Sequence, residues 1–226
     1  MNNFKEKAMK IVFLLTASFS ILAVALICVF LFANGIPAIK EIGLPDFLLG
    51  TKWKPGNDIY GIFPMILGSI YVTAGAIVIG VPVGILTSVF MAEYCPKKIY
   101  RPLKMATELL AGIPSIVYGL FGMLFFVTAL HWGLSLLSGA FTLVIMILPL
   151  IMRTAEEALK SVPDSYREAS FGLGAGKLRT IFTIVLPSAV PGILAGVILA
   201  IGRVIGETAA LIYTCLLYTS PSPRDI

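Results

Sequence analysis

Residues 161–187 read SVPDSYREASFGLGAGKLRTIFTIVLP and lie between two long apolar stretches. Apolar residues recur at helical spacing on both sides of the glycine-rich centre of this segment. Glycine interrupts helices and permits a sharp reversal of the chain. The segment therefore predicts a helix, a glycine turn and a second helix that ends at Leu186-Pro187. Ser161 and Asp164 fit the start of the first helix, with the serine as its cap.

The rest of the chain is too apolar for a soluble protein. Of its 226 residues, 58% are hydrophobic and only 13% are charged, whereas soluble domains contain about 25% charged residues. The apolar residues are gathered into stretches that suit helices crossing a bilayer, for which about 20 residues are needed. We therefore predict an all-α, polytopic membrane protein with five transmembrane helices.

Polar segments separate the predicted spans. Residues 1–10 precede a first transmembrane helix at 11–33, and residues 34–60 form a loop. A core at 61–214 contains four further spans and the polar loop at 153–187; the spans lie at about 62–91, 105–130, 134–152 and 188–214. The span at 105–130 contains Gly112-Ile113-Pro114-Ser115, which predicts a bend within the membrane.

The basic residues predict the orientation. Twelve of the 17 Lys and Arg residues lie in segments 1–10, 92–104 and 153–187, and three lie in segment 34–60. Because Lys and Arg are enriched in cytoplasmic loops, we expect a cytoplasmic N-terminus and a periplasmic loop at 34–60. The net charge of +5 is thus spread between apolar stretches. It forms no basic patch interleaved with aromatic residues, so we expect no nucleic-acid partner.

Arg203 and Glu207 are charged residues inside the last predicted span. Their spacing of four predicts one helical face. Charges within a membrane face the interior of a helix bundle or a water path. Two interpretations remain open: Arg203 attracts an oxyanion along a substrate pathway while Glu207 orients it, or the two form a salt bridge that fixes packing.

No constellation of residues predicts chemistry. The segment Gly172-x-Gly174-x-Gly176-Lys177 looks like a phosphate-binding loop, but the flanking residues and the absence of a preceding strand exclude that motif. The three cysteines have no metal-ligand spacing. We expect no catalysis, cofactor or metal site.

The pattern of the polar loop resembles a known docking loop. It has a Glu-Ala-Ser triplet, a glycine four residues later and an Ile-Val-Leu-Pro ending, as in the cytoplasmic EAA-type loop by which permeases of bacterial ATP-driven importers contact their ATPase subunits. This resemblance implies a set of docking residues: Glu168, Ala169, Ser170, Gly174, Ile184, Leu186 and Pro187.

Residues 61–214 are similar to permease subunits of bacterial phosphate importers, most of all to the PstA type. The stretches that carry the likeness include LAGIPSIVYGLFG at 110–122, ILPLIMRTAEEALKSVP at 147–163 and GRVIGETA at 202–209. The resemblance implies an ABC importer permease with six helices in the cell inner membrane. Its implied partners are a PstC-type permease, an ATPase dimer and a periplasmic phosphate-binding protein, with phosphate as the substrate.

The end of the chain does not fit this family. Residues 215–226 change abruptly to a Ser-Pro-rich sequence that resembles a translated sequencing adapter, and the sixth span is missing. We expect a non-native tail there. Three alternatives remain for the function: a permease for another oxyanion such as molybdate or sulfate, a non-transporting membrane scaffold, or an inactive fragment.

Overall fold

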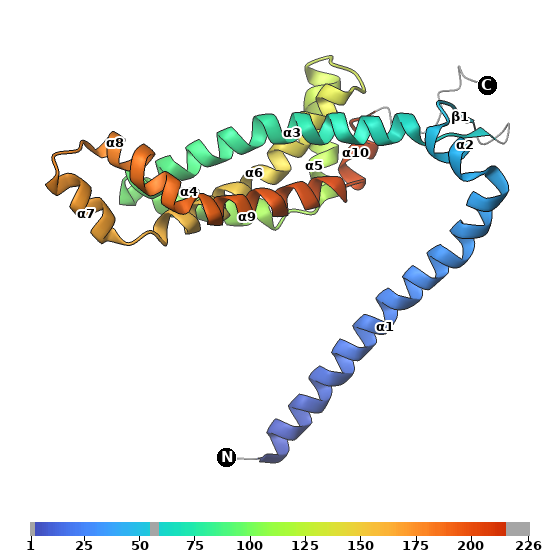
Figure 1. Ribbon diagram of the computed structural model, residues 1–226, viewed down its shortest axis with the longest axis horizontal. Helices are drawn as coiled ribbons and strands as arrows, with labels where there is room; N and C mark the ends of the chain where they lie inside the picture. Colours follow the sequence, from blue (N-terminus) through green and yellow to red (C-terminus); the bar gives the residue numbers. More distant parts are fainter. Residues whose placement is uncertain (1–2, 55–58, 216–226) are drawn as a thin grey trace. The chain divides into compact units, whose positions relative to one another are not determined.

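The computed structural model describes residues 3–54 and 59–215 (Figure 1), so the expected foreign tail lies almost entirely outside the described residues. Contacts divide the chain into two units, residues 1–64 and residues 65–226. Helices dominate both units and one two-stranded hairpin is present. The prediction of an all-α fold is confirmed.

The first unit contains α1 (Asn3–Ile42), α2 (Leu44–Leu49) and an antiparallel pair of short strands, β1 (Trp53–Lys54) and β2 (Ile59–Tyr60). The helix α1 continues nine residues beyond the predicted end of the first span, because apolar residues persist through Ile36 and Ile39. Its candidate membrane segment, Met9–Ile42, has no buried residue within its most apolar window, as a helix surrounded by lipid would have.

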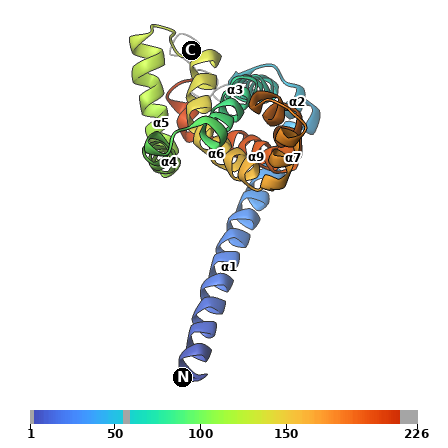
Figure 2. The ribbon, with the colours of Figure 1, turned by 90° about the vertical axis from the view of Figure 1, so that its left-hand side faces the viewer.

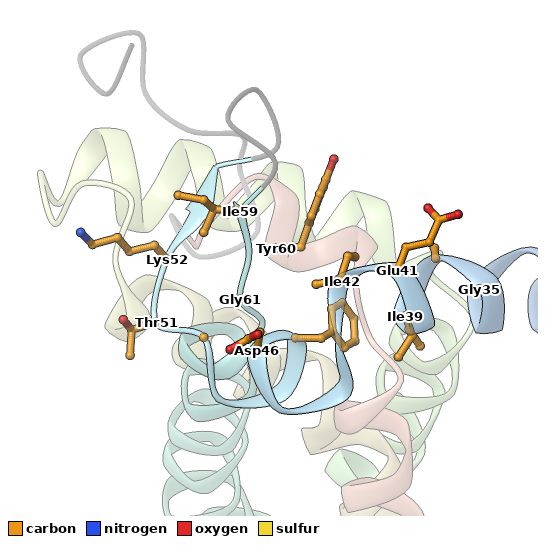
Figure 3. A pocket seen from close by; sticks show the side chains of 13 residues that line it. Gly35, Ile39, Glu41, Ile42, Asp46, Thr51, Lys52, Ile59, Tyr60 and Gly61 are labelled. Atoms are coloured by element: carbon orange, nitrogen blue, oxygen red, sulfur yellow. The ribbon is translucent and has the colours of Figure 1, made fainter.

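Two glycines close the loop between α2 and α3. A side-chain carbon on Gly50 would lie 2.7 Å from the Cα atom of Gly61, so both positions require glycine. A hollow of about 1050 Å³ lies beside this contact (Figure 3). The carboxylate of Glu41 and the ammonium group of Lys52 do not converge on this hollow, because the two side chains point outward in different directions in Figure 3. The hollow therefore lacks the convergent polar groups of a ligand site.

The second unit consists of α-helices, three π-helical segments (η2, η3 and η4) and the short turns that connect them. In chain order the elements are α3 (Phe63–Val89), η2 (Phe90–Tyr94), α4 (Lys97–Ala111), α5 (Ser115–Gly122), η3 (Met123–Ala129), α6 (Leu136–Lys160), α7 (Asp164–Gly172), α8 (Lys177–Thr180), η4 (Ile181–Val185), α9 (Leu186–Ile205) and α10 (Ala209–Ile212).

Among the described residues, four helices are long and apolar enough to cross a membrane, or five if one bent pair is counted as a span. The bent pair is α4 followed by α5 and η3, and its bend is 98°. The predicted bend is present, and it is sharp enough to break the span expected at 105–130 into two helices. The first of these begins at Lys97, inside the segment expected to be a loop.

The helix α6 is the centre of the second unit. Five of its residues at intervals of four are almost completely buried: Leu143, Ile147, Ile151, Ala155 and Leu159. Residues at this spacing lie along one face of a helix. The helix packs most extensively against α9, and also against α4, α5 and α10.

Small residues let neighbouring helices approach α6 closely. A side-chain carbon on Gly84 of α3 would lie 2.7 Å from Ile151, and one on Gly196 of α9 would collide with Thr154. Close approach of this kind drives helix association in lipid, where apolar surfaces gain nothing by leaving water. Gly80 of α3 makes the same kind of approach to Ile147 of α6.

The last predicted span is shorter than expected. The helix α9 ends at Ile205 rather than near residue 214, and Gly206 follows it. The chain then turns and forms α10, which packs against α5. A side-chain carbon on Gly119 of α5 would lie 2.8 Å from the Cα atom of Ala210, so the approach of α5 and α10 depends on glycine.

Candidate docking loop and intramembrane charges

The docking loop (residues 153–187) begins with the last turns of α6 and reverses through α7 and α8, which lie at one end of the second unit in Figure 1. The predicted cap of α7 by Ser161 is wrong. The Ser161 hydroxyl donates to the Ala158 carbonyl at 2.7 Å and so closes α6, while Pro163 precedes α7 without a side-chain cap. The prediction of a helix, a turn and a second helix is confirmed, but the predicted end of the second helix at Leu186-Pro187 is wrong, because that helix continues without a break into α9.

Gly174 makes the turn. Its φ of 81° lies in the left-handed region, which costs other residues roughly 1–2 kcal/mol. Gly172 and Gly176 do not have positive φ angles, and a side chain at either would meet no atom within 4 Å. Of the three glycines that the sequence offered, only Gly174 is required by the backbone conformation.

Ser170 holds the two arms of the turn together. It is 3% exposed, and its hydroxyl lies 2.8 Å from that of Thr180 on α8. The Thr180 hydroxyl also donates to the Gly176 carbonyl at 3.2 Å. Ser170 therefore acts within the loop, and its hydroxyl does not face a partner protein.

The outer surface of the turn is apolar and exposed. Leu173 at its tip is 90% exposed, and the neighbouring Glu168 and Ala169 are also exposed. A hollow of about 520 Å³ lies between α7 and the start of the continuous helix Lys177–Ile205. It is lined by Ala169 and Leu173 on one side and by Thr183 on the other. An exposed apolar tip beside a hollow is a surface suited to a protein partner.

The other residues predicted to dock lie along the second arm. Ile184 is half-buried and lines the hollow. Leu186 is half-buried and Pro187 is exposed in the first turn of α9. The structure thus gathers Ala169, Ser170, Gly174 and Ile184 around the hollow, leaves Glu168 exposed on α7 and places Leu186 and Pro187 at the base of α9.

Sequence reasoning missed the residue that anchors the loop. Arg167, 17% exposed, donates to Glu93 of η2 at 2.8 Å and to the Val162 and Leu159 carbonyls at 2.8 and 3.0 Å. It also pairs with Asp164 at 3.1 Å. Glu93 is 74 residues distant in sequence, so only the fold shows that α7 is fixed to the end of α3.

Two further contacts tie the loop to neighbouring helices. Lys177 donates to the Glu93 carbonyl and lies 4.5 Å from the centre of the Tyr94 ring. At the end of α6, Glu156 accepts hydrogen bonds from Lys160 and from Tyr100 of α4. The docking loop is therefore joined by polar side chains to the ends of both α3 and α4.

Arg203 and Glu207 do not share a helical face. Arg203 lies in the last turn of α9, which ends at Ile205, while Glu207 lies beyond Gly206 and its carboxylate accepts from the Ala210 N–H at 3.1 Å. The prediction of a common face is wrong because the helix ends between the two residues. Within residues 3–54 and 59–215, Arg203 makes no ion pair with a carboxylate.

Arg203 is nevertheless half-buried and near a polar group. Its neighbour Val204 belongs to the same buried cluster as Tyr118 of α5, whose ring carries a hydroxyl. The Tyr118 hydroxyl donates to the Leu110 carbonyl at 2.7 Å, across the bend between α4 and α5. Arg203 is therefore a partly buried cation beside the bend. No carboxylate of the described residues accepts a hydrogen bond from its guanidinium.

Residues 80–224 match a protein family described as the inner membrane component of binding-protein-dependent transport systems. A probable ABC transporter permease of Bacillus subtilis, YqgI, is 42% identical over 160 residues, which are 70% of this chain and 54% of that protein. The phosphate transport system permease protein PstC of Mesorhizobium japonicum is 34% identical over 83% of this chain and 64% of its own length. PstA 1 of Mycobacterium tuberculosis is 40% identical over 67% of this chain and half of its own length.

The chain thus spans about half to two thirds of the length of these relatives. Among solved structures, the inward-facing MetNI methionine ABC transporter is similar in fold, with a TM-score of 0.53 and 24% identity over 65% of this chain and 68% of that chain.

Proposed function

The chain belongs to the family of inner membrane components of binding-protein-dependent transport systems, and from this premise we propose that it is a permease subunit of an ATP-driven phosphate importer. Proteins of this family are membrane components of transporters rather than enzymes. In the proposal, phosphate passes between this chain and a second, PstC-type permease. An ATPase dimer supplies the energy, and a periplasmic binding protein delivers the phosphate.

The observation that supports the substrate proposal is that Arg203 has no carboxylate partner among the described residues. It is half-buried at the end of α9 and forms no ion pair among the described residues. The planar guanidinium fork matches two phosphate oxygens, and a cation inside a membrane protein marks a site for a charged ligand. Relatives named as phosphate transport permeases, at 34% and 40% identity, support the same substrate.

Uptake by the reconstituted complex tests this proposal. The full-length permease, its partner permease, the ATPase and the binding protein are placed in proteoliposomes, and ATP-dependent uptake of phosphate, sulfate and molybdate is compared. We expect uptake of phosphate alone. Preferred uptake of sulfate or molybdate identifies another oxyanion permease, and an assembled complex without uptake of any of the three identifies a scaffold or an inactive fragment.

Charge variants then test the role of Arg203. Arg203→Gln is expected to abolish uptake while the complex assembles normally. If Arg203 only formed a packing bridge with Glu207, removing both charges would restore uptake. We expect no rescue by the double variant Arg203→Gln with Glu207→Gln, because Glu207 bonds to the backbone of α10 instead. Rescue would contradict the pathway role.

We also propose that the docking loop couples this chain to the ATPase. The apolar tip at Leu173 and the exposed Glu168 offer a contact surface, and the Arg167 anchor holds that surface to α3. A short helix seated in a groove of a partner acts as a lever when its base is fixed. Movement of the ATPase would then reach the membrane helices through Glu93 and Tyr100.

Co-purification of the ATPase with permease variants tests the coupling role. Leu173→Ser and Glu168→Lys are expected to weaken retention of the ATPase, and Gly174→Trp is expected to do the same by projecting a large ring from the turn. Glu41→Lys is the matched control, because it makes the same charge change at an exposed position of the first unit. Normal retention and uptake with Gly174→Trp would overturn the assignment.

The proposed orientation places the N-terminus and the docking loop in the cytoplasm. Its support is the unequal distribution of Lys and Arg. In a variant lacking the native cysteines, a membrane-impermeant thiol reagent added to intact cells with a permeable outer membrane should label Lys52→Cys and spare Lys98→Cys. The opposite labelling pattern would contradict the orientation.

A further inference from the structure

A strip of charged side chains runs along α4 on a side that no other described element covers. It comprises four exposed residues: Lys97, Arg101, Lys104 and Glu108. Their spacings of four, three and four residues place them along one side of the helix over about 16 Å. We call these four residues the α4 strip.

The other sides of α4 have different surroundings. Tyr100, Leu103 and Thr107 are half-buried on the side that packs against α6. The opposite side is exposed and apolar, with Met105 and Leu109 each more than 60% exposed. The α4 strip therefore lies between a protein-facing side and an apolar side that suits lipid.

The direction of α4 makes this strip unusual. In Figures 1 and 2, α4 runs in nearly the same direction as α3 and α9, whereas α5 turns away from that direction. A helix parallel to membrane spans carries its charged side through the depth of the bilayer. Charged residues at such depth face water or protein because hydrocarbon does not solvate them.

The α4 strip leads toward Arg203. At the far end of α4, the Leu110 carbonyl accepts the hydrogen bond of Tyr118, and Val204, the residue after Arg203, lies in the same buried cluster as that tyrosine. Three cations on α4 and the uncommitted cation of α9 thus form a series from the cytoplasmic end of α4 to its bend with α5.

We propose that the α4 strip lines the cytoplasmic half of the anion path, with Lys97, Arg101 and Lys104 conducting a phosphate-like oxyanion from the bend beside Arg203 to the cytoplasm. The proposal rests on the transport function proposed above and adds a route and its residues. The anion would move from one weakly binding cation to the next along the path. The negative charge of Glu108 near the bend would weaken its binding there. Cationic clefts raise the local concentration of an anion and its rate of passage by about tenfold or more.

The helix supplies its own control for this proposal. Lys98 is exposed at the same end of α4 but is rotated by about 100° from Lys97, onto the side of Met105 and Leu109. If the basic residues of α4 serve only to hold the cytoplasmic end near anionic headgroups, then Lys98 and Arg101 are equivalent. If they line a path, only members of the α4 strip affect the anion.

The reconstituted full-length complex tests the route. The parental complex is measured first, and its choice of oxyanion decides the transport proposal independently. With the transported oxyanion, Arg101→Gln and Lys104→Gln are expected to lower uptake per assembled complex by about tenfold. Arg101→Lys should restore most of the uptake, and Lys98→Gln should match the parental rate. Equal losses at Lys98 and Arg101, or no loss at either, would overturn the route.

Chemical accessibility gives a second measurement that does not depend on turnover. In a complex free of native cysteines, Lys104→Cys should react with an anionic, water-soluble thiol reagent, and inorganic phosphate should slow that reaction. Lys98→Cys should react at a rate that phosphate does not change. A Lys104→Cys complex that fails to react, or that phosphate does not protect, would contradict a water-filled anion path beside α4.

Discussion

Two arginines in this chain, Arg167 in the docking loop and Arg203 at the end of α9, have opposite surroundings. Arg167 is 17% exposed and bonds to Glu93, Asp164 and two backbone carbonyls. Arg203 is half-buried, and among the described residues it has no carboxylate partner. The sequence around each looks alike, because both have an acidic residue within four positions and glycines nearby.

The difference separates an arginine that holds structure from one that is available to a ligand. All polar partners of Arg167 are internal, so its removal leaves Glu93 partly buried and unpaired. The guanidinium of Arg203 has spare donors near the bend of α4 and α5. Substitution at Arg167 should therefore reduce stability, whereas substitution at Arg203 should reduce transport with little effect on stability.

The largest effect is expected for Arg167→Ala. Loss of the pair with Glu93 and of two carbonyl contacts should lower the stability of the folded protein by about 3 kcal/mol. In a protein of this size that corresponds to a fall of roughly 10 °C in the thermal unfolding midpoint, measured in detergent by intrinsic fluorescence. Arg153→Ala is the matched control, since its ion pair with Glu157 is 61% and 66% exposed and should contribute less than about 1 kcal/mol. Equal effects of the two variants would remove the distinction.

A smaller effect is expected for Gly174→Ala. The positive φ of Gly174 makes alanine unfavourable by roughly 1–2 kcal/mol, so the midpoint should fall by several degrees. Gly172→Ala should leave the midpoint unchanged or raise it slightly, because Gly172 lies at the end of α7 without a positive φ. Similar falls for both variants would show that the turn does not depend on the Gly174 conformation.

The next effect concerns Ser170→Ala. It removes the buried hydrogen bond to Thr180, which typically contributes about 1 kcal/mol. The remaining bond from Thr180 to the Gly176 carbonyl limits the loss. Hydrogen exchange at the amides of α7 and α8 should increase while that of α6 stays unchanged. Unchanged exchange in the loop would mean that Ser170 does not hold its two arms together.

The smallest effect on stability is expected for Arg203→Gln. With no ion pair to lose in the described part of the chain, the variant should unfold within about 0.5 kcal/mol of the parental protein. The same thermal measurement checks this. A fall comparable to that of Arg167→Ala would place Arg203 among the structural arginines and would remove the contrast.

Short-range patterns predicted most of the docking loop correctly. The helix, the glycine turn and the second helix follow from residues within a few positions of one another, and Gly174 has the left-handed conformation that glycine favours. The Ser161 cap was predicted wrongly because two helix ends compete for that residue. Its hydroxyl bonds to the preceding helix instead of the following one.

The membrane segments show the limit of such patterns. The length of an apolar stretch predicts that a helix crosses lipid but not where the helix ends. Apolar residues near its end are compatible both with a helix that continues and with one that stops. The helix α9 stops at Ile205, and α10 is held against α5 where Gly119 permits close approach to Ala210. The sequence showed Gly206 but gave no indication that α5 would lie beside this turn.

The sequence by itself determined the lipid-embedded all-α class, the glycine turn of the docking loop and the bend at Gly112-Ile113-Pro114-Ser115, because each depends on composition or local spacing. Only the tertiary structure decided the pairing of Arg167 with Glu93, the separation of Arg203 from Glu207 and the exposed side of α4. The pair joins segments far apart in the chain, and the end of α9 and the exposed side of α4 depend on which other helices lie beside them. Their geometry is set by how the helices pack around α6, which no local pattern specifies.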